Sequence, residues 1–386
     1  MSKTDTRLRP DSPELADTAA DWACAYVHVP FCARVCPYCD FAVVEGRYDL
    51  ADRYLNAVES EIDSRPEWRR LDSVFVGGGT PSRFGAARLA GLVSALDRKF
   101  GLAPSAEVTL EANPEDWTPE LAANLVERGY TRVSFGAQSF DPSVLSCLGR
   151  RHTPARIAEA VADARGEGFR SVSIDLIFGT PGESLAGWRT TIEQAIELGT
   201  DHVSCYALTV EKGTPLSRAV AGGAPAPDPD LQADQYEMAD ELLSGAGLVR
   251  YEVSNWARPG HVCRYNLAVW AQGEYEAFGN GAHGFRRGRR FRNVRRLEAY
   301  LQRVEEGRSP RAGDDALTGP EAEQDRLFVG LRRAAGVSDG PGVEALLASS
   351  DGQRLLSAGV IDHSHGRLRV TRPLLTDEAE RAVLAL

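Results

Sequence analysis

The segment CARVCPYC, residues 32–39, places three cysteines within eight residues, separated first by three residues and then by two. Thiolates packed this closely repel one another unless a metal shares their charge. Sulfur ligands of this kind select zinc, copper(I) or an iron–sulfur cluster. The segment therefore predicts a metal centre.

The missing fourth ligand favours an iron–sulfur cluster over zinc. A structural zinc site takes four Cys or His ligands at short, paired spacings. The next cysteine is Cys147, and the sequence has no histidine between His28 and His152. A [4Fe–4S] cluster held by three cysteines leaves one iron open to a small molecule. Zinc remains an alternative, and disulfides fit less well because seven cysteines are an odd number.

Composition and charge bound the class of protein. With 386 residues, 43% hydrophobic and 26% charged, the chain has room for one large and one small domain of soluble type. A net charge of −11 argues against nucleic-acid binding. No apolar run reaches the ~18–20 residues of a membrane helix, which leaves only peripheral membrane contact open. The absence of a signal-like apolar core and the clustered cysteines favour the cytoplasm.

Alternating strand and helix patterns predict an α/β fold. Six strand–helix alternations run from Tyr26 to about residue 247 and indicate a parallel sheet with right-handed crossovers. Six units suit an open barrel better than a closed eight-stranded one, and a doubly wound sheet is the alternative. Besides the first strand, strands are expected at residues 71–76, 107–112, 132–138, 171–177 and 202–208. Helices are expected at residues 50–62, 89–100 and 185–198, and starting near 118 and 153.

The remaining segments complete the predicted organisation. Residues 1–21 are polar and are expected to be a disordered lead, followed by the partial barrel over 22–247. Residues 248–312 form a less regular extension on the substrate side. Residues 313–386 are expected to be a small, mainly helical, winged-helix-like domain, with a hairpin strand at 366–371 and a terminal helix from Thr376.

Polar and glycine residues follow one expected strand after another. A GGGT run occupies residues 77–80, Glu111 and Gln138 end the next two strands, and Asp175 stands inside the fifth. A ligand site in a parallel barrel lies at the carboxyl ends of its strands. A carboxylate within an apolar strand needs a partner, because burying it unpaired is costly. The glycine run is neither a P-loop nor a GxGxxG motif, and a simple tight turn is the alternative.

These residues carry a family resemblance. The cysteine spacing, with an aromatic residue before the last cysteine, resembles the radical S-adenosylmethionine (SAM) superfamily. The wider segment HVPFCARVCPYCDF, residues 28–41, is similar to HemW-type heme chaperones, relatives of the oxygen-independent coproporphyrinogen III dehydrogenases. The resemblance spans roughly residues 24–300. It implies a partial (β/α)6 barrel in which Cys32, Cys36 and Cys39 hold a [4Fe–4S] cluster.

The same resemblance implies a bound SAM molecule. A reduced cluster can pass one electron to the sulfonium of SAM and release a 5′-deoxyadenosyl radical. Arginine suits the SAM carboxylate, and carboxylates suit its ribose hydroxyls. The positions implied for SAM contacts are Tyr26, Tyr38, Gly78, Gly79, Thr80, Glu111, Gln138, Arg150, Asp175 and Ala207.

Two differences favour the chaperone branch. The dehydrogenases carry a further cysteine two places after the third, where this chain has Phe41, and they have a longer N-terminal region. The resemblance thus implies heme binding and delivery to an unidentified acceptor protein, with no catalytic residue assigned. The alternatives are a coproporphyrinogen III dehydrogenase or related radical methyltransferase, and a scaffold that binds a cluster but neither SAM nor heme.

The heme motif is altered in this chain. HemW proteins have HNxxYW before a GxGAHS-like turn, whereas residues 265–270 read YNLAVW and residues 279–284 read GNGAHG. Because tyrosine can ligate heme iron, Tyr265 is a candidate axial ligand, with His261, Cys263 and His283 as others. Seven arginines follow between residues 286 and 296. They are expected to form a solvated hairpin, and the alternative is a basic rim for heme propionates.

Overall fold

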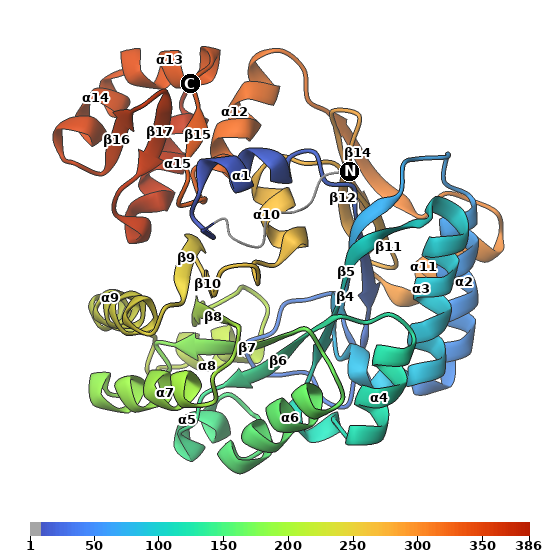
Figure 1. Cartoon of the computed structure of the whole chain (residues 1–386). Coiled ribbons are helices and arrows are strands. Elements are labelled where there is room, and N and C mark those ends of the chain that lie inside the picture. The colour runs from blue at the N-terminus through green and yellow to red at the C-terminus, as the bar shows by residue number, and fades with distance from the viewer. Residues whose placement is uncertain (1–8) are drawn as a thin grey trace.

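The computed structural model describes residues 9–386 of the chain. Its main feature is an open sheet of twelve strands (Figure 1). Six parallel strands lie side by side in chain order at the middle of the sheet. The two edge strands of the sheet do not pair with each other, so the barrel is not closed. The predicted partial α/β barrel is confirmed. Its strands are β1 (Cys24–Val29), β4 (Leu71–Gly78), β5 (Leu102–Ala112), β6 (Arg132–Gln138), β7 (Ser171–Phe178) and β8 (His202–Ala207).

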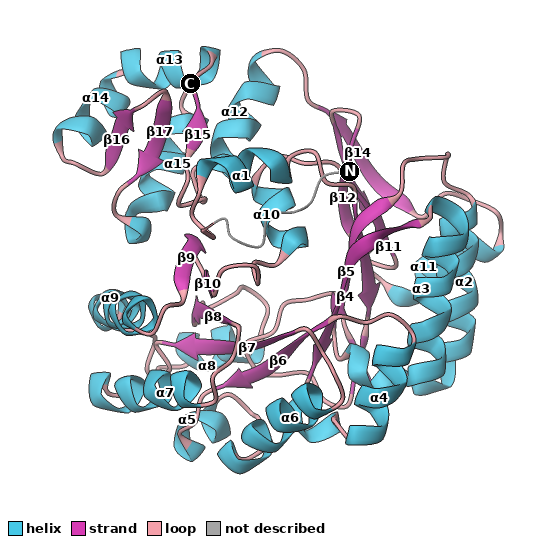
Figure 2. Ribbon diagram, in the orientation of Figure 1, coloured by secondary structure: helices cyan, strands magenta, loops and turns pink. Residues whose placement is uncertain are grey.

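Helices cover the outer face of the curved sheet (Figure 2). Several begin with a side-chain cap followed by proline, as at Thr118 and Thr153, whose hydroxyls accept the backbone N–H of Leu121 and Arg156. The covering helices are α2 (Ala51–Asp63), α3 (Ala86–Phe100), α4 (Pro119–Glu127), α6 (Pro154–Gly166), α7 (Leu185–Glu197) and α9 (Pro229–Gly245). Shorter helices, α5 (Pro142–Cys147) and α8 (Pro215–Ala221), lie in the loops after β6 and β8.

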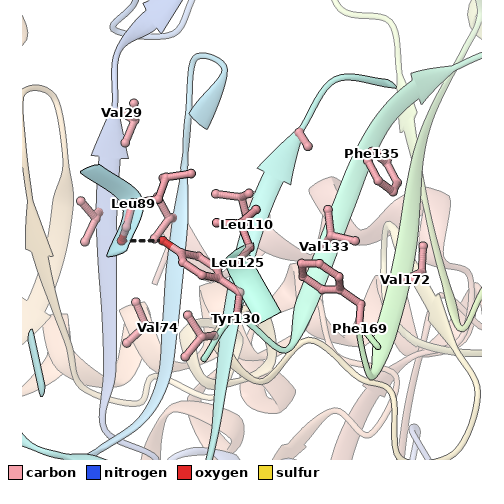
Figure 3. Packing of buried hydrophobic residues seen from close by; sticks show 14 of the residues in the cluster. Val29, Val74, Leu89, Leu110, Leu125, Tyr130, Val133, Phe135, Phe169 and Val172 are labelled. Carbon is pink, nitrogen blue, oxygen red and sulfur yellow. Dashed lines mark hydrogen bonds between the residues drawn. The ribbon is translucent and has the colours of Figure 1, made fainter. Parts of the chain in front are cut away.

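The two faces of the sheet differ in polarity. Alternate side chains along the strands, such as Val74, Leu110, Val133 and Val172, join the helices in the main hydrophobic core (Figure 3). The hydroxyl of Tyr130 donates to the carbonyl oxygen of Leu89 within this core. The inner face is polar instead. Its buried polar residues are Ser73, Thr109, Arg132, Ser134, Ser173, His202 and Ser204. A polar inner face suits a barrel that holds a polar ligand rather than a packed interior.

The expectation that residues 248–312 are less regular is wrong. The strand β11 (Tyr275–Phe278) pairs in parallel with β1, and three antiparallel strands continue from it. These are β12 (His283–Arg286), β13 (Arg289–Asn293) and β14 (Arg311–Ala316). At the other end β10 (Asn255–Ala257) and β9 (Val249–Glu252) extend β8, and helices α10 (Arg264–Trp270) and α11 (Leu297–Glu305) complete the segment. The strands β11 to β14 are four to six residues long, and β13 has arginine at three of its five positions, so the sequence shows no clear alternation there.

The predicted disordered lead is also corrected. Residues 1–8 lie outside the described part, but α1 (Pro13–Ala19) is a helix whose N-cap, Ser12, accepts the N–H of Leu15. Leu15 is buried, and Asp17 pairs with Arg367 of the C-terminal unit. Tertiary contacts stabilise this short helix, whose length alone would leave it marginal in water.

The C-terminal residues have a hydrophobic cluster of their own. Four helices surround a small antiparallel sheet, and the predicted hairpin strand and terminal helix are present. The elements are α12 (Pro320–Gly330), β15 (Val337–Ser338), α13 (Pro341–Ala348), α14 (Ser350–Ser357), β16 (Ile361–Ser364), β17 (Arg367–Val370) and α15 (Thr376–Leu384). Over residues 9–386, none of the helices combines the length and the apolar character that a membrane crossing requires.

Candidate functional site

A cavity of ≈ 700 Å³, here called the first cavity, lies where the parallel strands end. Twelve of the fourteen residues predicted for the metal centre and its ligand line this one cavity. They are Cys32, Cys36, Tyr38, Cys39, Gly78, Gly79, Thr80, Glu111, Gln138, Arg150, Asp175 and Ala207. They come from seven separate stretches of the chain, so the fold brings together residues that lie far apart in the sequence.

The cysteine loop is fixed at its base by the rest of the barrel. The two-residue strands β2 (Phe31–Cys32) and β3 (Val44–Glu45) pair in parallel, which closes the loop that carries the three thiols. Phe31 is fully buried and stacks against Phe84, and the N–H of Leu216 donates to the carbonyl of Pro37. The loop is therefore held by packing at Phe31 and by a backbone hydrogen bond at Pro37.

Polar donors point at two of the sulfurs. The hydroxyl of Thr80 lies 3.6 Å from Cys32 Sγ, and Arg150 Nη1 lies 3.5 Å from Cys36 Sγ. Burial raises the pKa of the Cys32 thiol to about 11, so without a metal this sulfur stays protonated at neutral pH. Hydrogen-bond donors and a nearby guanidinium favour the thiolate form once a metal shares its charge.

The donor set fits an iron–sulfur cluster. Within residues 9–386, no three His, Cys, Asp or Glu side chains converge as a single metal ion requires. In a four-iron cluster each cysteine binds a different iron, so its three thiolates need not meet at one point. The cavity that the thiols share has room beside them for a further ligand, and we therefore favour the cluster over zinc.

Two glycines let the loop and the strand end approach closely. A Cβ added to Gly79 would lie 2.9 Å from Cys32 Sγ and equally close to the backbone of Pro30. Gly78 has φ +119°, and a Cβ there would lie 2.7 Å from the His28 ring. Both positions require glycine, so the run is more than an ordinary tight turn.

Two carboxylates lie in the wall of the first cavity. Glu111 accepts the N–H of Gly78 at 2.9 Å, and Asp175 accepts the hydroxyl of Ser134 at 3.0 Å. Loss of solvation raises both pKa values, and that of Glu111 reaches about 7. Each carboxyl keeps an oxygen that can accept a hydroxyl or amine of a bound molecule.

The pKa of Glu111 predicts a pH-dependent stability for the unliganded protein. Its pKa rises from 4.5 to about 7 on folding, so the folded chain holds the additional proton between these values. The contribution of Glu111 to the free energy of unfolding should therefore fall as the pH rises through this window, by at most about 3 kcal/mol. Denaturant unfolding of wild type and Glu111→Gln at pH 5 and pH 8 measures the effect. At pH 8 the free energy of unfolding of the variant should rise relative to that of the wild type. A difference between the two proteins that does not change with pH would contradict the raised pKa of Glu111.

Arg150 is held by residues that the sequence pattern did not single out. Its guanidinium donates to the side-chain oxygen of Asn113 and, at 2.8 Å, to the carbonyl of Gly136. Its Nε is buried and has no hydrogen-bond partner among residues 9–386. Asn113 also donates to the hydroxyl of Thr80. It follows the β5 strand end directly, so the rule that identified Glu111 would also have found Asn113.

The outer part of the first cavity has apolar, exposed side chains. Phe41, Tyr206 and Leu374 are 63%, 43% and 39% exposed and line its mouth. Leu374 belongs to the short 3-10 helix η4 (Pro373–Leu375) of the C-terminal unit. The sequence contained no signal for this contribution, because the C-terminal residues resemble those of an ordinary small domain.

A second cavity of ≈ 710 Å³ adjoins the first. The two share lining residues, namely Asp40, Phe41, Gly78 and Glu111. Tyr26 and Tyr265, the other two predicted site residues, line the second cavity and not the first. Their rings stack with centroids 5.8 Å apart, and the Tyr26 hydroxyl lies 3.0 Å from His28 Nδ1. The two tyrosines therefore lie in the cavity next to the one that holds the three thiols, and Asp40 and Phe41, directly after Cys39, line both cavities.

The candidate heme ligands are divided between the second cavity and the protein interior. His283 lines the cavity, whereas His261 and Cys263 line neither cavity. Cys263 is buried, and its N–H donates to the hydroxyl of Tyr251. Tyr265 is half-buried, and loss of solvation raises its pKa well above the usual value for tyrosine.

The arginine-rich segment forms the predicted hairpin, β12–β13. Three of its arginines are neutralised within the protein: Arg286 pairs with Glu274 and Glu276, Arg289 with Asp314, and Arg290 with Asp325. Arg292 and Arg295 instead line the second cavity, and neither forms an ion pair within residues 9–386. The hairpin is therefore partly a neutralised surface and partly a basic cavity wall.

Comparisons with known proteins show which family and fold the chain resembles. The family model of the radical SAM superfamily matches residues 26–195. The chain is 40% identical over 375 residues to the heme chaperone HemW of Mycobacterium tuberculosis (strain CDC 1551 / Oshkosh), covering 93% of this chain and 94% of that protein. It is 33% identical to HemW of Bacillus subtilis (strain 168), covering 90% and 94%. Its fold is similar to that of the radical SAM enzyme coproporphyrinogen III oxidase (HemN) from Escherichia coli, with a TM-score of 0.80, 22% identity and coverage of 99% and 95%.

Proposed function

The chain belongs to the HemW family within the radical SAM superfamily, and from that membership we propose that it is a heme chaperone. In this proposal it binds heme together with a SAM-coordinated [4Fe–4S] cluster and passes the heme to an acceptor protein. The observation that carries the proposal is the similarity to HemW over nearly the whole chain, combined with three thiols in a cavity at the strand ends.

The residues of the first cavity have distinct proposed roles. Cys32, Cys36 and Cys39 hold the cluster, and Thr80 and Arg150 donate hydrogen bonds to its thiolates. When bound, the cluster supplies an iron with an open position and a source of one electron for SAM.

The other cavity residues receive SAM itself. Glu111 and Asp175 offer carboxylate oxygens to its hydroxyls and amine, and the guanidinium of Arg150 is placed to attract its carboxylate. Gly78 and Gly79 leave the strand end free of side chains, so that backbone groups can approach the ligand. Tyr38, Gln138 and Ala207 complete the cavity wall around it.

The proposal includes a reducing compartment, the cytoplasm, and a separate acceptor protein. All seven cysteines are free in the structure, as the reduced state of such a protein requires. The exposed apolar side chains at the mouth of the first cavity, Phe41, Tyr206 and Leu374, offer a surface on which an acceptor could dock.

Anaerobic reconstitution of the full chain tests this function. Iron and sulfide analysis should give one [4Fe–4S] cluster, calorimetry should detect SAM binding, and hemin should produce a saturable Soret band. Heme loaded on the protein should then pass to apomyoglobin faster than hemin carried by serum albumin. Absence of hemin binding would refute the chaperone. Release of 5′-deoxyadenosine with turnover of coproporphyrinogen III would indicate an enzyme instead.

A further inference from the structure

We propose that the second cavity is the heme compartment, with His283 as the axial ligand of the iron and Arg292 and Arg295 as partners of the two propionates. This inference rests on the proposed function and assigns a location and ligands within it. It places the heme beside the cluster and SAM of the first cavity, with Gly78 and Glu111 in the wall that the two cavities share.

The walls of the second cavity suit a flat, partly apolar macrocycle. Tyr265 stacks on Tyr26 and lies 5.1 Å from Phe75, measured between ring centroids, and Tyr275 meets it edge-on. These rings come from α10, β1, β4 and β11, so four elements hold one aromatic wall. The volume of ≈ 710 Å³ lies in the range of cofactor-sized pockets.

The basic residues of the cavity come from one hairpin. His283 and Arg292 are directly paired across β12 and β13, so their side chains lie on the same face of the sheet. Arg295 follows just beyond β13, and all three residues are exposed. The imidazole and the two guanidiniums therefore line one cavity together with Tyr26, Tyr265 and Tyr275.

Charge compensation distinguishes these two arginines from three of their neighbours. Arg286, Arg289 and Arg290 each have an acidic partner, whereas Arg292 and Arg295 have none within residues 9–386. An uncompensated pair of guanidiniums at a cavity wall favours a ligand with two carboxylates, and bidentate Arg–carboxylate pairs are among the stronger hydrogen bonds. Heme, with its two propionates beside an apolar ring, has this combination of groups.

His283 is a better iron ligand than Tyr265. A tyrosine must lose its proton to ligate iron, and the environment of Tyr265 raises its pKa and fixes its ring in the aromatic wall. A neutral imidazole ligates without losing a proton, and the His283 side chain has no hydrogen-bond partner within residues 9–386. His261 and Cys263, the other candidates, face neither cavity.

Binding of three porphyrins to the reconstituted full chain distinguishes the contact to the iron from the contacts to the propionates. The porphyrins are hemin, metal-free protoporphyrin IX, and protoporphyrin IX dimethyl ester. His283→Ala should weaken the binding of hemin roughly tenfold or more and shift its Soret band, yet leave the affinity for metal-free protoporphyrin unchanged. The double variant Arg292→Gln/Arg295→Gln should weaken the binding of hemin and of protoporphyrin roughly tenfold or more. Its affinity for the dimethyl ester should equal that of the wild type. Tyr265→Phe should keep the wild-type Soret band.

Matched variants control for nonspecific effects. His261→Ala removes an imidazole from outside both cavities, and Arg296→Gln removes a neighbouring guanidinium that does not line the second cavity. Both should bind like the wild type, and circular dichroism should show that every variant is folded.

The outcomes distinguish this inference from the proposed function. If the wild type binds no hemin, the chaperone function itself fails. If the wild type binds hemin but His283→Ala keeps the same affinity and Soret band, His283 is not the ligand although the function stands. A Soret shift in Tyr265→Phe alone would make Tyr265 the ligand. Equal binding of the free acid and the ester by wild type would overturn the role of the arginines.

Discussion

Serine in place of Cys32, Cys36 and Cys39 together should leave a protein that is folded but holds no cluster after anaerobic reconstitution. All three thiols line the first cavity, and within residues 9–386 no other set of cysteines or histidines is gathered to replace them. Iron and acid-labile sulfide should fall to background, the broad visible absorbance should disappear, and SAM binding measured by calorimetry should be lost with it. The fold should survive because the main hydrophobic core does not include these side chains.

Cys147→Ser is the matched control for this experiment. Cys147 is the one exposed cysteine among residues 9–386, and it does not line the first cavity. The control should reconstitute to the wild-type iron and sulfide content. A triple variant that still binds four irons with sulfide would show that other ligands hold the cluster. A wild type that binds one zinc ion instead would show that the three cysteines form a zinc site.

Replacement of Glu61 by leucine should cause the largest loss of stability among the variants considered. Glu61, on α2, is 1% exposed and accepts hydrogen bonds from Arg65, Gly279, Asn293 and Tyr300. Removal of the carboxylate leaves these donors without an acceptor. It also leaves the buried guanidinium of Arg65 with a weaker ion-pair partner. Breaking a buried ion pair in this way costs about 3–5 kcal/mol. The denaturant midpoint should fall accordingly, with an unchanged slope.

Asp63→Asn is the control on the same helix. Its side chain is exposed, and no ion pair of Asp63 is seen within residues 9–386, so this change should shift the free energy of unfolding by less than about 0.5 kcal/mol. The network of Glu61 also holds the turn between β11 and β12, which leads directly to His283. A Glu61→Leu variant as stable as Asp63→Asn would show that this network contributes little to folding.

The sequence by itself determined the middle of the fold and the composition of the first cavity. Strands such as residues 132–138 alternate apolar and polar side chains, and each helix pattern between them specifies a crossover, so the parallel order follows from local periodicity. The cysteine spacing is equally local. Because the carboxyl ends of parallel strands share one edge, Glu111, Gln138 and Asp175 could be expected to meet before their positions were known.

Only the tertiary structure decided what lies at the two ends of the sheet. The strands β11–β14 are four to six residues long, and β11 joins them to the main sheet by pairing with β1, more than 200 residues earlier in the chain. The helix α1 is stabilised by contacts with the C-terminal unit, and that unit places Leu374 at the mouth of the first cavity. The division between Tyr26 and Tyr265 on one cavity and the cysteines on the other depends on the same long-range contacts. Local patterns record which residues can form a strand or a helix, but which segments meet depends on burial and charge pairing summed over the whole chain.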